Sequence, residues 1–192
     1  MKLAVLLLSA AVAAQSASTT QAQADQFQQK LQQIINNGNT ESSTLRRTTV
    51  TQAEANAYLK IRGPELLPLG VTDATVAAVG AGRLNGRAVV DLDAIREKKS
   101  SGGLLDPKTY LTGRLPVTAS GILHTRDGKA RFELESATVG GIPIPKSFLQ
   151  EIVSYYSRSS DYPNGINLDQ VYEIPANIKE IQVGQGNAIV VQ

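Results

Sequence analysis

Apolar and polar residues alternate over long stretches in the middle of the chain, and this period of two constrains the fold more than any other feature. Residues 71–79 alternate, and so do the two runs on either side of Asp127-Gly128. Successive side chains of a strand point to opposite faces, so such runs predict strands with one dry and one wet face. Asn85-Gly86 and Asp127-Gly128 are both typical of two-residue hairpin turns. The centre of the chain is therefore expected to be an antiparallel sheet.

The run after Asp127-Gly128 predicts a half-buried strand. The alternation places Phe132, Leu134 and Ser136 on one face, and Arg131, Glu133 and Glu135 on the other. Pro116 lies in the preceding run, and because proline lacks a backbone N–H it favours an edge strand, a bulge or a late strand start there.

A corner rich in glycine and proline follows this strand. Gly140-Gly141 is expected to release the chain from the sheet, and Pro143 to keep the crossing extended. Pro145 suits the first position of a helix, where a missing N–H needs no partner. Residues 145–157 then carry apolar side chains at helical spacing. We expect this apolar helix to lie across the dry face of the sheet.

The N-terminal quarter predicts export and then two helices. Lys2 precedes an apolar run that ends in small residues, which is the pattern of a secretory signal peptide, and residues 1–24 are assigned to it and to a disordered lead-in. A weakly amphipathic, Gln-rich helix should begin at Asp25, and a linker should follow to about Thr49. Thr51 and Glu54 have the spacing of a capping box, so a second helix should start there and end at Gly63-Pro64.

Residues after the apolar helix predict two or three closing strands, the last pair turning at residues 184–186. Helices followed by runs of hairpins are typical of an α+β fold. We expect a curved antiparallel sheet with a long apolar helix packed across one face, plus N-terminal helices. Residues 25–192 are expected to form this single domain, with helix and linker at 25–49 and the core at 50–192.

Composition excludes several classes of function. Lys and Arg number 19 against 17 Asp and Glu, and they are scattered, so no basic stripe points to nucleic acid. The chain has no Cys and one His, His124, which cannot build an ordinary zinc site. No sequence around a serine matches a nucleophile elbow. We therefore expect no catalytic residue, no metal and no cofactor.

Two pairs of carboxylates leave an alternative open. Asp91 and Asp93 share a strand face, and Glu133 and Glu135 share another. Such pairs could flank a sugar or hold a cation. Their alternation with apolar residues favours a solvated face instead.

The apolar helix and the dry sheet face supply the candidate ligand-binding residues. Few aromatic side chains are present to fill the space between them, and apolar pockets with few polar groups are typical of ligand sites. Tyrosines near the helix end could place a polar tip at the mouth of a groove. The candidate residues are Phe132, Leu134, Ile142, Ile144, Phe148, Leu149, Ile152, Tyr155 and Tyr156.

Three phrases of the sequence resemble a known family. They are "VTQAEANAYL" (50–59), "VGGIPIPKSFLQEI" (139–152) and "YEIPANIKEIQVGQGNAIV" (172–190). Together they resemble the tubular-lipid-binding-like proteins of bacterial envelopes, over about residues 50–191. The resemblance is one of hydrophobic spacing and turns, and it implies a non-enzymatic envelope protein that binds or carries lipid. It offers no counterpart for the Gln-rich first helix.

These patterns predict a secreted or periplasmic protein that binds a hydrophobic ligand, namely a lipid, in a groove between sheet and helix. No transmembrane span is expected after cleavage. The rival hypothesis is a structural or protein-interaction module of the envelope, which would dock a protein partner through its sheet edge or its first helix. An enzyme acting on glycans through the four carboxylates is the third.

Overall fold

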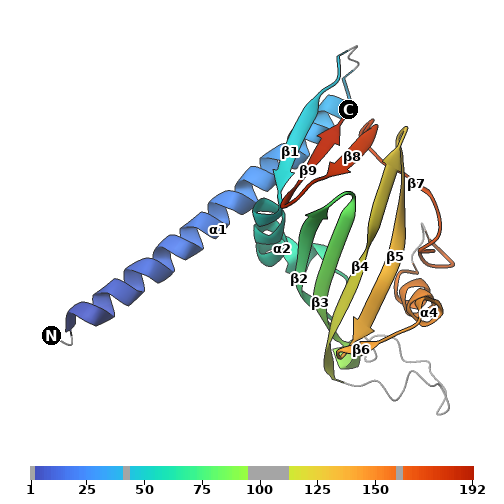
Figure 1. The fold of residues 1–192 in the computed structure, drawn as a ribbon. Coiled ribbons are helices and arrows are strands. Elements are labelled where there is room, and N and C mark those ends of the chain that lie inside the picture. The colour runs from blue at the N-terminus through green and yellow to red at the C-terminus, as the bar shows by residue number, and fades with distance from the viewer. Residues whose placement is uncertain (1–2, 41–43, 95–112, 159–161) are drawn as a thin grey trace.

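The computed structural model describes residues 3–40, 44–94, 113–158 and 162–192, with side chains of the first helix from Thr20 onward. Its helices are α1 (Leu3–Gly38), α2 (Gln52–Leu66) and α4 (Lys146–Tyr156), and its strands form two antiparallel sheets (Figure 1). Antiparallel sheets with helices segregated from them confirm the α+β class.

The larger sheet has the strand order β2-β3-β4-β5-β6, and β7 also pairs with β5. The bounds are β2 (Val71–Gly80), β3 (Arg83–Asp91), β4 (Arg114–Arg126), β5 (Lys129–Val139), β6 (Ile142–Pro143) and β7 (Tyr172–Glu173). Pro116, expected at an edge, bulge or strand start, lies near the start of β4, which is a central strand. It pairs with β3, and its carbonyl accepts a hydrogen bond from the turn after β5.

Three tight turns connect the strands of this sheet. The Asp127-Gly128 hairpin is confirmed, with φ values of 50° and 76°. Two-residue turns of this kind need positive φ at both central residues. Ala81-Gly82 provides the turn between β2 and β3, with φ values of 51° and 79°. The prediction of a hairpin at Asn85-Gly86 is therefore wrong, because these two residues lie inside β3.

The third turn corrects the interpretation of the corner. Gly140 and Gly141 have φ values of 60° and 81°, and Val139 pairs with Ile142 across them. The glycines therefore fold β6 back onto β5 as a short hairpin instead of releasing the chain from the sheet. Pro145 then occupies the N-cap position, and α4 begins at Lys146, one residue later than predicted.

A bulge in β5 changes which residues share a face. Ser120 pairs with Ser136, whereas Gly121 pairs with Leu134, so Glu135 is the extra residue. An extra residue inverts the alternation beyond it. Ser136 therefore lies on the same face as the charged residues, and the prediction that it accompanies Leu134 is wrong.

The smaller sheet has the order β1-β9-β8, with β1 (Arg47–Thr51), β8 (Glu180–Val183) and β9 (Asn187–Val191). A single sheet was expected, and residues 47–49 were expected to be linker. The closing hairpin at residues 184–186 is confirmed, but its strands pair with β1 instead of extending the larger sheet. Ile34, Ile178 and Val190 form the buried cluster between this sheet and α1.

Helices α1 and α2 pack against each other. The rings of Phe27 and Tyr58 have centroids 4.9 Å apart, and the Nζ of Lys30 lies 2.7 and 2.8 Å from the carboxylate oxygens of Glu54. Helix α1 ends at Gly38 as expected, but it continues through the residues predicted to be a disordered lead-in, and Ala24 is buried. Cleavage of a signal peptide stays a prediction. Among the described residues, no helix is long and apolar enough to cross a membrane.

Helix α2 begins at the predicted capping box. The backbone N–H of Glu54 donates to Thr51 Oγ1 at 3.2 Å, and the N–H of Thr51 donates to the Glu54 carboxylate at 2.8 Å. The helix runs to Leu66 with Pro64 in its last turn, slightly beyond the predicted end.

The outer edge of β2 is covered by α2 side chains. The side-chain amide of Asn56 donates to the C=O of Val76 and accepts from its N–H. The side-chain oxygen Oε1 of Gln52 accepts from the N–H of Ala78. The C=O of Ala78 accepts from the N–H of Gly186. Covering an edge strand in this way protects it from pairing with another chain.

Helix α4 differs from the long apolar helix that was expected. It has 11 residues and packs at β5, the margin of the larger sheet (Figure 1). The larger sheet is not strongly curled. The expected covering of one whole sheet face by α4 is therefore wrong.

Candidate ligand-binding face

One face of the larger sheet is apolar across four strands, and we call it the apolar face. Paired residues of neighbouring strands lie on the same side of a sheet, so the strand registers define its rows. The face consists of Val76 and Ala78 of β2, Leu84, Gly86, Ala88 and Val90 of β3, Leu115, Val117, Ala119, Gly121 and Leu123 of β4, and Phe132, Leu134, Ala137 and Val139 of β5.

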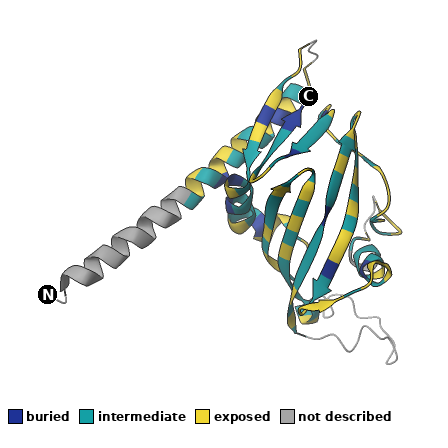
Figure 2. Ribbon diagram, viewed as in Figure 1, coloured by how far each residue is buried: buried dark blue, intermediate teal, exposed yellow. Residues whose placement is uncertain are grey.

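The apolar face is only half covered. Of its residues, Gly121 and Ala137 are buried and the rest are intermediate in exposure. Figure 2 shows buried segments in the smaller sheet and around α2, while the strands of the larger sheet, apart from short buried segments in β4 and β5, alternate between intermediate and exposed. The main buried cluster belongs to the smaller sheet. Within the described residues, the apolar face is therefore not the filled centre of a core.

The middle of this face is open at Gly86. A Cβ atom added there would meet only the carbonyl oxygen of Ala119, at 4.0 Å. Its cross-strand neighbours Val76 and Ala119 are small or medium in size, and Ala137 continues the same row. We call this row, in which short side chains adjoin the open position at Gly86, the trough.

A cleft of about 510 Å³ adjoins the apolar face at its β2 margin. Ala57, Leu67 and Val71 are among its lining residues, with polar groups from α1, α2 and β2 at its sides. Val71 pairs with Val90 of the apolar face, so cleft and face are contiguous. Small-molecule pockets have volumes of roughly 300–1,000 Å³, so the cleft is of suitable size.

Two predicted site residues lie on the apolar face, Phe132 and Leu134 of β5. The ring of Phe132 crosses over Gly121, because a Cβ added at that glycine would lie 2.7 Å from Phe132 Cζ. Phe132 therefore covers the apolar face at Gly121.

The remaining predicted site residues lie at the β5 margin. Leu149 of α4 is 8% exposed and so serves packing, whereas Ile144, Phe148 and Ile152 are half-buried. Ile142 is 69% exposed and extends the apolar row through its pairing with Val139. The side chains of Tyr155 and Tyr156 lie outside the described part of the structure. A ligand role for these residues stays a prediction.

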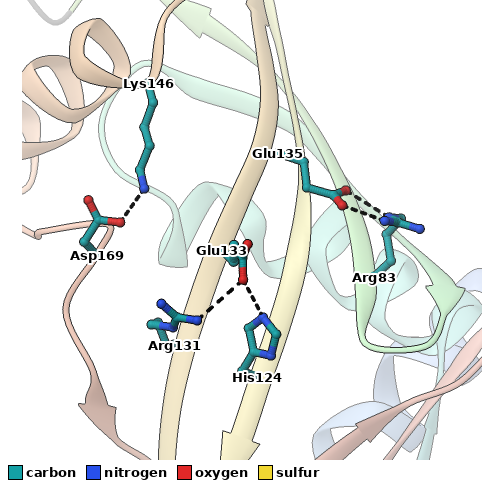
Figure 3. A network of polar contacts seen from close by, with 7 residues as sticks. All are labelled: Arg83, His124, Arg131, Glu133, Glu135, Lys146 and Asp169. Atoms are coloured by element: carbon teal, nitrogen blue, oxygen red, sulfur yellow. Dashed lines mark hydrogen bonds and ion pairs between the residues drawn. The ribbon is translucent and has the colours of Figure 1, made fainter.

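The opposite, polar face of the sheet carries the charged residues (Figure 3). Glu133 accepts from His124 Nε2 at 2.8 Å and from Arg131 at 3.5 Å. Glu135 and Arg83 form a bidentate pair at 2.5 and 2.9 Å, and hydrogen bonding from this guanidinium lowers the pKa of Glu135. Glu133 and Glu135, one of the two predicted carboxylate pairs, therefore lie on a solvated face and have cationic partners.

The other predicted carboxylate pair has a structural role. Asp91 accepts from the backbone N–H groups of Asp93 and Ala94, and Asp93 accepts from the N–H of Gly113. Within residues 3–40, 44–94, 113–158 and 162–192, no group of His, Asp and Glu side chains is suited to a metal ion.

Sequence reasoning missed the residues that open the apolar face. Gly86 was assigned to a turn, and the α2 side of the face was not considered. The alternation of Leu84, Ala88 and Val90 around Gly86 could have placed this glycine in a strand, since a glycine inside a strand often marks a close approach of another group.

Comparisons with known proteins are sparse. The sequence matches no protein-family model and no curated protein. A crystal structure of a lipopolysaccharide binding protein is similar at 15% identity and a TM-score of 0.23, over 76% of this chain. This chain spans 40% of the length of that protein.

Proposed function

We propose that this protein binds a ligand with a long apolar surface, such as the acyl chain of a lipid, on the apolar face. The observation that carries the proposal is the open row at Gly86, where a band of apolar side chains has space above it. Such a ligand would remove apolar surface from water on both partners, which contributes roughly 25 cal/mol per Å².

The positions of the helices support this proposal. Helix α2 packs on β2 and α4 packs on β5, so they flank the two margins of the sheet. The small side chains of Ala88 and Ala119 lie between these margins. A surface of small residues with a helix at each margin suits a thin, flexible chain better than a bulky ring system.

The cleft beside α2 extends the same surface. Its shared residue Val71 allows one ligand to pass from the trough at Gly86 into the cleft. Lys60 also lines the cleft and would supply a positive charge near an anionic headgroup. Binding, and not catalysis, is the activity proposed, in an exported protein of the cell envelope.

The test fills the trough without disturbing the fold. Gly86→Val places a β-branched side chain at an extended strand position with open space, so stability should be retained or increased. Thr49→Val is the matched control, because Thr49 is exposed on β1 of the smaller sheet and lies outside both faces of the larger sheet. Both variants and the natural chain would be purified, extracted with organic solvent and examined by native mass spectrometry.

Co-purified lipid should be found in the natural chain and in Thr49→Val, and should fall about tenfold in Gly86→Val if the valine excludes the ligand from the trough. Consistent absence of lipid from the natural chain, with no uptake of added phospholipid, would refute the proposal. Equal loading of all three would show that lipid binds elsewhere.

The second candidate function is an interaction module whose apolar face is covered by a protein partner. The exposed side chains of Leu66, Leu69 and Ile142, at 57%, 52% and 69%, favour it. Docking through the apolar stripe of α1 is disfavoured, because Ile34 already packs in the core of the smaller sheet. Loss of a partner in Gly86→Val, in a chain that never carries lipid, would support this alternative.

A further inference from the structure

A second surface, on the polar face, has the composition of a ligand site. Two adjacent rows cross the sheet from β2 to β5. One row is Thr75, Arg87, Thr118 and Thr138, and the other is Ala77, Asn85, Ser120 and Ser136.

These rows form a depression because most of their side chains are short. The hollow has a volume of about 410 Å³. It is lined by every residue of the two rows except Thr138, together with Gly86 and Ala119 between them. The Arg83–Glu135 ion pair stands beyond the row of Asn85, and Arg87 stands in the neighbouring row. Four strands lie about 4.8 Å apart, so the hollow is open to a ligand up to roughly 14 Å long.

The hollow offers hydrogen-bond donors that the protein does not use. Within the described residues, the side chains of Arg87 and Asn85 make neither a hydrogen bond nor an ion pair, whereas Arg83, Arg114 and Arg131 are paired with carboxylates. A guanidinium carries five N–H donors in a planar fork that matches phosphate oxygens.

The hydroxyl groups add further donors. The hydroxyls of Ser120 and Ser136 lie 2.8 Å apart, and those of Thr118 and Thr138 lie 2.6 Å apart. Each pair has two hydroxyl protons and uses one between its members, which leaves one proton to donate outward. Hydroxyls can also accept hydrogen bonds, so the same surface suits the hydroxyl groups of a polyol.

We propose that this hollow binds the phosphate group of a small hydroxyl-rich molecule, of which glycerol phosphate and sugar phosphates are examples. Arg87 takes the phosphate, Thr118 and Asn85 donate to its oxygens or to neighbouring hydroxyls, and the serine pair contacts the polyol. The site lies on the opposite face from the proposed lipid trough, so it does not depend on that proposal.

Isothermal titration calorimetry tests the site with glycerol 3-phosphate, inorganic phosphate and glycerol. We expect saturable binding of glycerol 3-phosphate, weaker binding of inorganic phosphate and no binding of glycerol. Arg87→Gln should weaken the binding about tenfold, because it removes the charge-assisted pair. Arg47→Gln is the matched control, since Arg47 is exposed on β1, and it should change the affinity less than about twofold.

A third variant makes the opposite prediction. Glu135→Gln releases Arg83 from its ion pair beside the hollow, so binding should tighten about two- to fivefold. A merely structural role for these residues would not move affinity in opposite directions. No saturable binding of glycerol 3-phosphate, or equal losses in Arg87→Gln and Arg47→Gln, would overturn the proposal.

A separate arm distinguishes a free phosphate from a lipid headgroup. Co-sedimentation uses vesicles of phosphatidylcholine with and without about one-fifth phosphatidylglycerol, whose headgroup contains glycerol phosphate. Binding to the mixed vesicles that Arg87→Gln reduces would assign the site to the headgroup. Binding of soluble glycerol 3-phosphate without such vesicle binding would assign it to the free molecule.

Discussion

The ion pair between α1 and α2 allows the most direct test of how the N-terminal helices are held. Glu54 is 6% exposed, and its carboxylate accepts from Lys30 at 2.7 and 2.8 Å and from the N–H of Thr51 at 2.8 Å. Glu54→Gln keeps a side-chain oxygen for Thr51, since Gln also serves in capping boxes. The substitution therefore removes mainly the charge that pairs with Lys30.

The expected loss of stability follows from the burial of the two partners. A hydrogen bond to a charged group contributes about 1.5–3 kcal/mol, and breaking a fully buried ion pair costs about 3–5 kcal/mol. The Lys30 side chain is 29% exposed and stays partly hydrated, which favours the lower range. We expect Glu54→Gln to lower the free energy of unfolding by about 2–3 kcal/mol, and the melting temperature by about 5–10 °C.

Dependence on pH makes this prediction sharper. Burial raises the pKa of Glu54, but hydrogen bonds from Lys30 and Thr51 outweigh burial, and the pKa in the folded chain lies below the ordinary value of 4.5. A carboxylate with a lowered pKa stabilises the fold fully above its unfolded pKa, and this contribution is lost as the pH falls through the folded pKa. The difference between the natural chain and Glu54→Gln should therefore narrow below about pH 4.5.

Urea unfolding at pH 7 and pH 3.5, followed by circular dichroism, measures both effects. Glu65→Gln is the control, because Glu65 is 71% exposed and lies 3.9 Å from Arg62, so its loss should cost less than about 0.5 kcal/mol. A Glu54→Gln chain as stable as the control, or an unchanged difference at the lower pH, would refute the reasoning.

Four further substitutions test the packing, each by urea unfolding. Gly121→Ala places a Cβ 2.3 Å from a β5 carbonyl oxygen and should cost about 2 kcal/mol or more; a neutral effect would contradict the close approach. Asn56→Ala leaves the N–H and C=O of Val76 without their partners, so it should lower the free energy of unfolding by about 1–3 kcal/mol. It should also speed hydrogen exchange at the N–H of Val76, and an unchanged exchange rate would contradict this assignment. Ile34→Ala should lower the free energy of unfolding by about 2–4 kcal/mol and Ile35→Ala by under about 1 kcal/mol, because these side chains are 6% and 49% exposed. Equal losses in the two variants would contradict the placement of Ile34 in the core.

Local patterns predicted much of the fold because short-range chemistry decides them. The Thr51–Glu54 capping box and the Asp127-Gly128 turn each depend on residues that are adjacent in sequence. Alternation likewise placed Phe132 and Leu134 on the dry side of β5, as their register shows.

Features that depend on distant partners were not predictable in this way. Pairing of β1 with β9 joins residues far apart in the chain, and no local pattern in residues 47–49 distinguishes a strand from a linker. The bulge at Glu135 arises where β5 must match β4, and it moves Ser136 to the other face. A one-residue offset between strands is invisible in either strand alone.

Gly86 connects the wrong turn prediction with the candidate site. Its neighbour Asn85 suggested a turn, but Ala81-Gly82 already closes the β2–β3 hairpin with positive φ at both residues. Gly86 is then an interior strand residue, where glycine weakens a strand because it has no side chain to pack. A side chain at this position would meet no close contact at its Cβ, so packing against the described residues does not require glycine. The cost in strand stability is explained if the space above Gly86 is occupied by a ligand, and it is this space that Gly86→Val would fill.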